Sequence, residues 1–387
     1  MKQFDALPVF NEKQQAIDDA VNQTRRALAS LTDGWKDSAS ERGVYLPVGN
    51  QEWTAGFWTG ELNLAYTLSG DPLFLDAVRR QIPSFLDRIV RRVDVDHHDM
   101  GFLYSPSCVA FFQETGDGMA CQAALLAADN LVSRFQEKGQ FIQAWGPMGQ
   151  PENYRLIVDC LMNLPLLFWA YAQTGKARYQ DVAARHLHTA LSCVLRPDDS
   201  TYHTFYFDTM TGKPLYGRTA QGNRDDSAWA RGQAWAVYGS AVAYRHMKDP
   251  LALDVFHRAL AFFLNHLPAS IIPYWDFDFS DGSGQPRDSS ALAITICGMQ
   301  EMAGLEPDGS LARELSQTSD RLLRILWKEC AVTGVSVSNG QLLHGTYAKK
   351  SPWNTVTDRG VDECTSWGDY FYMEALRRSQ GGWISCW

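Results

Sequence analysis

The sequence predicts an all-α protein with the (α/α)6 barrel fold, in which six helical hairpins form a double toroid. Segments that are apolar on nearly all sides alternate with amphipathic segments, and this pair recurs about six times. A helix that is apolar all round must be covered all round, so the apolar helices should form an inner ring and the amphipathic helices an outer ring. The same pattern runs from end to end, so we expect one domain over residues 1–387.

The elements follow from this alternation in chain order. The predicted inner helices span residues 62–68, 104–113, 159–171, 229–244, 290–302 and 369–378. The predicted outer helices span residues 11–31, a segment beginning at 72, 120–135, 179–195, a segment beginning at 250, and 312–326. Asn11 is a suitable N-cap for the first of them. Asp71-Pro72 and Asp249-Pro250 each combine an N-cap with proline at the first helical position, where its missing N–H costs nothing.

The excess length of the chain lies in polar, aromatic and glycine-rich loops that precede the inner helices, so these loops should gather at one end of the barrel. Loops concentrated on one face are where function is expected. They span residues 94–104, 139–156, 196–227, 267–288 and 331–366.

Composition excludes several classes of function. The net charge of −9 leaves no basic stripe for nucleic acid. No apolar run approaches the roughly 18 residues that suggest a membrane span, and the N-terminus lacks the pattern of a secretory signal. The eight cysteines lack the paired spacings of a zinc site, which favours a cytoplasmic protein. We expect a monomer or a homodimer.

The aromatic content is 12% and includes 13 Trp, many of them beside polar residues and glycines. Tryptophan planes next to hydrogen-bonding groups suit flat, half-apolar ligands, of which sugars are the commonest. A large helical core that simply needs tryptophan is the competing explanation.

The charged run Asp96-His97-His98-Asp99 leads directly into an apolar stretch that favours burial. It is either a solvated connection between helices or the floor of a pocket that holds a carboxyl. Histidine and carboxylate are also good metal ligands, but adjacent residues rarely all face one ion, so a metal site is the weaker interpretation.

Asp159 opens an apolar helix and could simply cap it. Its apolar flanks favour a second interpretation, a partly desolvated carboxyl with a raised pKa, as a general acid requires. Arg231, in a tryptophan-rich helix mouth, is a candidate for binding an acidic sugar's carboxylate or a pocket aspartate. Asp288 could do no more than cap its helix.

Six motifs, in order along the chain, resemble those of the unsaturated glucuronyl hydrolases, glycoside hydrolase family 88. They are Asp-His-His-Asp-Met-Gly-Phe-Leu-Tyr-Ser (96–105), Gln-Ala-Trp-Gly-Pro (143–147), Asp-Cys-Leu-Met-Asn-Leu-Pro-Leu-Leu (159–167), Tyr-His-Thr-Phe-Tyr-Phe (202–207), Gln-Gly-Asn (221–223) and Arg-Gly-Gln-Ala-Trp (231–235). The resemblance implies the (α/α)6 barrel and an oligosaccharide substrate with a 4,5-unsaturated glucuronic acid at its non-reducing end, left by a polysaccharide lyase.

The resemblance also implies the roles of residues. Asp159 corresponds to the general acid and base that hydrates the C4=C5 vinyl ether, and Asp99 to a second essential carboxylate. The residues that correspond to sugar-binding positions are Trp53, His98, Trp145, His203, Gln221, Arg231 and Trp235. No metal and no cofactor are implied. Lys349 and Lys350 lie where related enzymes differ in sulfate preference and are candidate sulfate contacts.

Three alternatives stay open at this point. A sister family, the unsaturated rhamnogalacturonyl hydrolases of pectin degradation, shares the barrel and the helix-start aspartate but lacks the Asp-His-His-Asp motif. A glycan-binding protein that has lost turnover would also keep the pocket. The third alternative is a metal-dependent toroidal enzyme.

Overall fold

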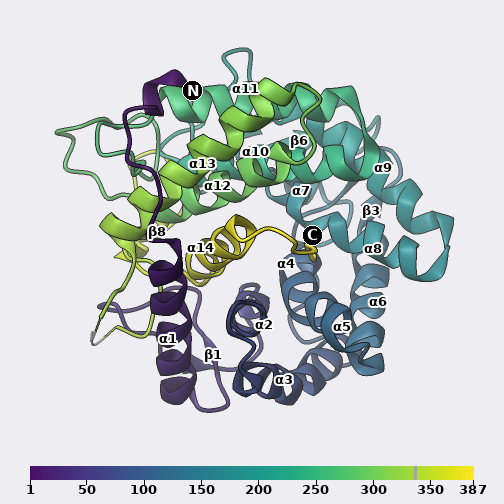
Figure 1. Ribbon diagram of the computed structural model, residues 1–387. Coiled ribbons are helices and arrows are strands. Elements are labelled where there is room, and N and C mark those ends of the chain that lie inside the picture. Colours follow the sequence, from purple (N-terminus) through teal and green to yellow (C-terminus); the bar gives the residue numbers. More distant parts are fainter. Residues whose placement is uncertain (335–337) are drawn as a thin grey trace.

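The structure, a computed structural model, describes residues 1–334 and 338–387, so residues 335–337 of the predicted loop 331–366 lie outside the described residues. Figure 1 looks along the axis of a closed ring of helices surrounded by a second ring, which confirms the predicted (α/α)6 barrel. The inner ring is formed by α2 (Ala55–Ser69), α4 (Met100–Tyr104) with its continuation α5 (Ala110–Thr115), α7 (Cys160–Asn163) with α8 (Pro165–Thr174), α10 (Ala230–Met247), α12 (Ser289–Ala303) and α14 (Ser366–Ser379). The outer ring is formed by α1 (Lys13–Leu31), α3 (Pro72–Val90), α6 (Gly118–Ser133), α9 (Ala177–Cys193), α11 (Pro250–Asn265) and α13 (Gly309–Cys330).

Contacts between neighbouring inner helices close the ring. Each inner helix packs against the next: α2 against α4, α4 against α7, α7 against α10, α10 against α12, and α12 against α14. The contact between α14 and α2 closes the ring. The two kinds of helix differ as predicted: nearly every residue of α12 is buried, whereas α3 buries one face and exposes Arg79, Arg80 and Asp87 on the other. The hydrophobic core therefore lies within and between the two rings.

The predicted caps are partly confirmed. The carboxylates of Asp71 and Asp249 each accept a hydrogen bond of 2.9 Å, from the backbone N–H groups of Leu73 and Leu251. Asn11 was the wrong cap, because α1 begins at Lys13 and the residue at its N-cap, Glu12, makes no side-chain capping bond.

The inner helix predicted at 104–113 begins earlier, at Met100, and contains the π-helical segment η2 (Ser105–Val109) between α4 and α5. A π turn frees backbone carbonyl groups from the regular helical pattern. The side chain of Asn63 on α2 donates hydrogen bonds to two of them, at Pro106 (2.9 Å) and Ser107 (3.2 Å).

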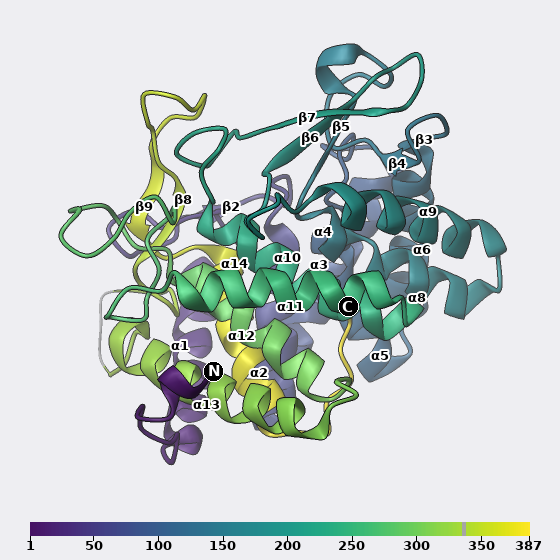
Figure 2. The same cartoon turned by 90° about the horizontal axis from the view of Figure 1, so that it is seen from above.

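Small antiparallel sheets lie at one end of the barrel, together with the long loops (Figure 2). They are β1 (Trp35–Lys36) with β2 (Pro47–Val48), β3 (Phe135–Gln136) with β4 (Phe141–Ile142), β5 (Arg155–Ile157) with β6 (Thr204–Phe207) and β7 (Pro214–Arg218), and β8 (Gly345–Ala348) with β9 (Arg359–Glu363). Short 3-10 turns lie at Lys2–Phe4 and Pro151–Asn153. The gathering of the loops at one face agrees with the prediction.

The end of the C-terminal tail packs among the inner helices. Trp387 is buried there, stacks on Phe371 and donates a 2.7 Å hydrogen bond from Nε1 to Glu374. Among the residues that the structure describes, no helix combines the length and the apolar character needed to cross a membrane.

Candidate active site

All the inner helices begin at the loop-rich face, and a cavity of about 460 Å³ opens there. This volume falls within the range of about 300–1,000 Å³ that is typical of small-ligand sites. The backbone N–H groups at the starts of the inner helices give this end of the barrel a positive potential, which favours an anionic ligand. The cavity is lined by Glu52, Trp53, Arg92, Asp94, Val95, Asp96, His97, Asp99, Trp145, Asp159, His203, Gln221, Trp229, Arg231, Trp235 and Tyr347.

Asp159 occupies the N-cap position of α7, but its side chain makes no capping hydrogen bond. Its Oδ1 atom is buried and has no hydrogen-bond partner among the described residues, and the side chain keeps 13% exposure at the cavity wall. An unpaired buried carboxyl is costly unless it is protonated or functional. The geometry therefore favours the second of the two interpretations of Asp159, a reactive carboxyl rather than a helix cap.

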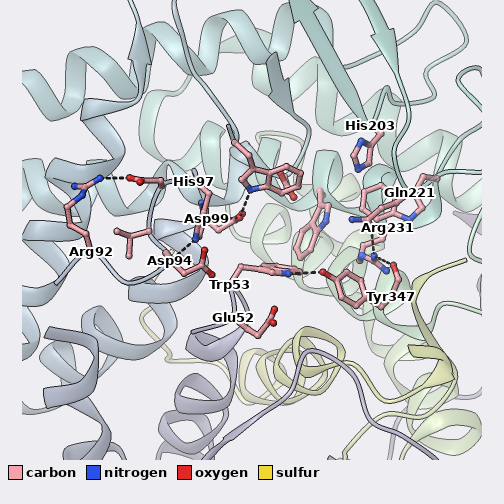
Figure 3. A pocket seen from close by; sticks show the side chains of 16 residues that line it. Glu52, Trp53, Arg92, Asp94, His97, Asp99, His203, Gln221, Arg231 and Tyr347 are labelled. Atoms are coloured by element: carbon pink, nitrogen blue, oxygen red, sulfur yellow. Dashed lines mark hydrogen bonds and ion pairs between the residues drawn. The ribbon is translucent and has the colours of Figure 1, made fainter. Parts of the chain in front are cut away.

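Asp99 lies beside Asp159; one indole N–H donates to its carboxylate, and two imidazole rings lie against it. Trp145 donates from Nε1 to Asp99 Oδ2 at 3.3 Å, and Nδ1 of His97 lies 3.1 Å from the same oxygen (Figure 3). His98 Nε2 lies 3.4 Å from Asp99 Oδ1 and 3.5 Å from Asp159 Oδ1, so one imidazole touches both carboxyls. The three side chains form a compact unit, with one ligand-type atom from each within 4.8 Å of the others.

The pKa values of the two carboxyls are shifted in opposite directions. Burial, together with the negative charge of Asp99, raises the pKa of Asp159 well above its ordinary value, against the opposing effect of Arg231. Burial also acts to raise the pKa of Asp99, but His98, His97 and the Trp145 hydrogen bond outweigh it and lower that pKa to about 2. Asp99 therefore stays ionised down to low pH, whereas Asp159 holds its proton to higher pH than an ordinary carboxyl, as a general acid and its ionised partner require.

Arg231 lies in the first turn of α10 and is fixed on several sides. Its Nη1 atom donates to Asp288 Oδ2 at 2.7 Å, and its Nη2 atom donates to Gln221 Oε1 at 2.8 Å. The guanidinium also donates to the backbone carbonyls of Thr346 and Tyr347, each at 2.6 Å. Asp288 sits at the N-cap of α12 without capping it, so its role is to hold Arg231.

Aromatic rings flank this guanidinium. Its central carbon lies 4.5 Å from the ring centroid of Trp229 and 4.7 Å from that of Trp367. Trp53 stacks on Trp367 and donates a 3.0 Å hydrogen bond to the hydroxyl of Tyr347. Figure 3 shows the Asp99 end of the cavity and the Arg231 and Tyr347 end, with Trp53 between them. One end thus offers carboxyls and the other a fixed cation.

His203 contributes a polar edge to the cavity wall. Its Nδ1 atom lies 2.6 Å from the hydroxyl of Thr204 and accepts a 3.4 Å hydrogen bond from the backbone N–H of Ala220, which places the ring proton on Nε2. Burial lowers the pKa of His203 to about 3, so the imidazole is neutral near neutral pH and can donate from Nε2 to a ligand. Gln221 similarly uses its oxygen on Arg231 and leaves its amide nitrogen for another partner.

Eight of the nine predicted site residues line the cavity. They are Asp159, Asp99, Trp53, Trp145, His203, Gln221, Arg231 and Trp235. His98 does not line it: its side chain is 1% exposed and lies behind the two carboxyls, with its ring edge-on to Trp145. Burial lowers the pKa of His98 to about 4, so this imidazole is neutral near neutral pH.

Trp229 and Tyr347 line the cavity as well, although neither is among the predicted site residues. The sequence held a signal for both, because Trp229 is two residues from Arg231 and Tyr347 falls within the predicted loop 331–366, which precedes an inner helix. Asp96 and His97 also line the cavity. Asp96 pairs with Arg92, and His97 Nε2 lies 3.0 Å from the carbonyl of Asp94, so both also order the loop that carries Asp99.

The two lysines predicted as sulfate contacts, Lys349 and Lys350, instead bond to groups of their own loop. Lys349 pairs with Asp358 at 2.7 Å, and Lys350 donates to the carbonyl of Asn354 at 2.8 Å. Neither lysine is among the described residues that line the cavity.

In the described part of the chain, one group of side chains has a spacing that could hold a metal ion, and it consists of His98, Asp99 and Asp159. Neither ring nitrogen of His98 has a hydrogen-bond partner among the described residues. Carboxylate and imidazole are ligands that suit several divalent ions.

The chain is similar to known glycoside hydrolases along most of its length. The model of Glycosyl Hydrolase Family 88 matches residues 8–278. The unsaturated chondroitin disaccharide hydrolase of Streptococcus pneumoniae (strain ATCC BAA-255 / R6) is 45% identical over 389 residues, which cover 100% of this chain and 97% of that protein. The unsaturated glucuronyl hydrolase of Bacillus sp. (strain GL1) is 39% identical, over 97% of this chain and 98% of the relative.

Solved structures are similar along the whole chain as well. The crystal structure of an unsaturated glucuronyl hydrolase from Streptococcus agalactiae has a TM-score of 0.93 at 43% identity and covers 98% of this chain and 95% of that one. A mutant of the S. agalactiae enzyme, with one aspartate replaced by asparagine and complexed with dGlcA-GalNAc6S, has a TM-score of 0.87 at 39% identity and covers 100% of this chain and 96% of the other.

Proposed function

The chain belongs to glycosyl hydrolase family 88 and hydrolyses unsaturated glucuronyl residues from glycosaminoglycan-derived disaccharides, and we propose that Asp159 is the general acid and base of this reaction. The observation that carries this proposal is the state of Asp159. Its carboxyl faces the cavity, leaves its helix uncapped, has a raised pKa and lies within 4.8 Å of the Asp99 carboxyl, whose pKa is lowered.

The reaction begins with proton transfer to the vinyl ether of the unsaturated sugar. Asp159 gives its proton to C4, the π electrons of C4=C5 form the new C–H bond, and positive charge develops on C5 and the ring oxygen. The neighbouring carboxylate of Asp99 stabilises this charge electrostatically. Water then adds to C5 and gives a proton to the Asp159 carboxylate, so the same residue acts as acid and then as base.

The remaining steps need no further residue. The hemiketal at C5 opens to a ketone by breaking its bond to the ring oxygen, which leaves a hemiacetal at C1. The hemiacetal collapses to an aldehyde and releases the aglycone alcohol, so one water is consumed in total.

The other cavity residues hold the sugar in place for the proton transfer. Arg231 presents a fixed cation for the uronate carboxylate, and His203 and Gln221 offer donors to ring substituents. Trp53, Trp145 and Trp235 supply flat apolar surface for the ring. We assign His98 a positioning role, because it lies behind Asp99 and Asp159 in contact with both carboxyls.

Chondroitin disaccharides are the substrates that we propose this chain prefers. Three streptococcal relatives that are 44–45% identical are named unsaturated chondroitin disaccharide hydrolases.

Absorbance of the conjugated uronate tests the function. The wild-type protein should abolish this absorbance in unsaturated chondroitin disaccharide, and Asp159→Asn should not, while it still binds the disaccharide. A glycan-binding protein without turnover would leave the absorbance unchanged, and a preference for unsaturated rhamnogalacturonyl substrates would identify the sister family. Full activity of Asp159→Asn would remove Asp159 from the mechanism.

Three further expectations accompany this proposal. All eight cysteines are unpaired, which is consistent with the predicted reducing, cytoplasmic location. A single domain over residues 1–387 and a monomeric or homodimeric state also stay predictions. Limited proteolysis and light scattering would test these two.

A further inference from the structure

A second cavity of about 300 Å³ adjoins the active site. Trp145 and His203 line both cavities, so the two spaces meet at these side chains. A sugar chain that leaves the active site beside Trp145 therefore lies next to the second cavity. Most of its remaining lining comes from the sheet β5–β6–β7 and the segment that follows β7.

The sheet places two arginines on the same face. Arg155 on β5 is opposite Tyr206 on β6, and Thr204 on β6 is opposite Arg218 on β7. Residues that face each other across strands, and residues two apart along a strand, point to the same side of a sheet. Arg155, Thr204, Tyr206 and Arg218 thus share the face that lines the second cavity.

The charge of this cavity is entirely positive. Arg155 and Arg218 are its only charged lining residues in the described part of the chain, and neither forms an ion pair with a described carboxylate. Arg155 donates from Nη1 to the hydroxyl of Tyr206 at 2.9 Å and to the carbonyl of Glu152 at 3.1 Å, both neutral groups. The buried Nε atom of Arg155 has no hydrogen-bond partner among the described residues.

The contrast with the active site is sharp, because five acidic side chains line that cavity: Glu52, Asp94, Asp96, Asp99 and Asp159. The net charge of the chain is −9, yet the two arginines of the second cavity are not held there by ion pairs with described carboxylates. Guanidinium groups recognise sulfate and carboxylate through paired hydrogen bonds. The second cavity thus suits an anionic group on the sugar residues that follow the unsaturated one.

We propose that the cavity lined by Arg155 and Arg218, here called the arginine subsite, binds an anionic group on the leaving part of the substrate. That group is a sulfate ester on the second sugar or the carboxylate of a uronate at the third. The proposal rests on the proposed function, because it assigns a binding site for the aglycone of that reaction. Arg155 and Arg218 are then specificity residues that do not touch the reacting atoms.

Steady-state kinetics on matched substrates tests the proposal. The substrates are unsaturated disaccharides with an unsulfated, a 4-sulfated or a 6-sulfated second sugar, and an unsulfated tetrasaccharide with a uronate at the third position. The variants are Arg218→Gln, at an exposed position where folding is not at risk, and Arg155→Gln, with Arg313→Gln on the outer helix α13 as a control. The readout is the ratio of kcat/KM for each anionic substrate to that for the unsulfated disaccharide.

Loss of one charge-assisted hydrogen bond should lower that ratio about tenfold in Arg218→Gln and leave it unchanged in Arg313→Gln. A fall confined to one sulfated disaccharide identifies a sulfate as the anion, and a fall confined to the tetrasaccharide identifies the uronate carboxylate. If the wild type is active and the ratios in Arg218→Gln and Arg155→Gln match those of the control, the arginine subsite does not exist. If the wild type consumes none of the substrates, the proposed function itself has failed.

Discussion

Removing the carboxylate of Asp288 tests whether a buried ion pair fixes Arg231 in the active site. The two side chains are 0% and 2% exposed, and the donor and acceptor atoms lie 2.7 Å apart. In Asp288→Ala the guanidinium stays buried without its counterion, which costs about 3–5 kcal/mol of folding free energy. Unfolding a chain of 387 residues carries an entropy of about 0.8 kcal/mol/K, so the melting temperature should fall by about 4–6 °C.

Differential scanning calorimetry of Asp288→Ala and of the control Asp87→Ala measures this effect. Asp87 pairs with Arg91 on the surface, at 57% and 68% exposure, and its loss should move the melting temperature by no more than about 1 °C. Asp288→Ala should also lower kcat/KM by about tenfold or more, because a guanidinium without its anchor holds the uronate less well. Equal melting temperatures for the two variants, with unchanged kcat/KM, would refute this account of Arg231.

Three other predictions concern the carboxyl pair. Asp99→Asn should lower kcat by about 10²–10⁴-fold and move the alkaline limb of the pH profile to lower pH, because Asp159 acts when protonated and loses the negative charge that helps to raise its pKa. An unchanged alkaline limb would contradict the coupling. Dialysis against EDTA should leave the activity intact, whereas a loss that a divalent ion restores would point to a metal on His98, Asp99 and Asp159. Asp159→Asn should melt above the wild type at pH 8 and lose this advantage toward pH 4, because above its ordinary pKa of 3.8 the unfolded state releases a proton that the folded state keeps; an offset independent of pH would count against the raised pKa.

The fold was predictable because the pattern that specifies it is local. Apolar and amphipathic segments with helical periodicity recur along the chain, and each kind has one stable place in a double ring. The π-helical segment Ser105–Val109 was not predictable, because Asn63 of another helix satisfies its carbonyls. The small sheets were missed for a similar reason, since the pairing of Arg155 with Tyr206 joins short strands that are distant in the sequence.

The site was predictable to the extent that its residues lie at the starts of inner helices. From the sequence, Asp159 could be either a helix cap or a catalytic carboxyl. The structure distinguishes the two, because its carboxyl makes no capping hydrogen bond. The role of Asp288 depends on Arg231, 57 residues away, and no local pattern carries that contact. His98 is next to Asp99 in the sequence but lies behind it in space, because the backbone turns its side chain into the core.

Hydrolysis in D₂O, followed by NMR of the product, tests the central claim most directly. If Asp159 protonates C4 of the unsaturated sugar, the product carries one deuterium bound to C4, the C4=C5 double bond is gone, and Asp159→Asn gives no such product. Cleavage that leaves the double bond intact and puts no deuterium on C4 would be ordinary glycoside hydrolysis, and it would contradict the role assigned here to Asp159.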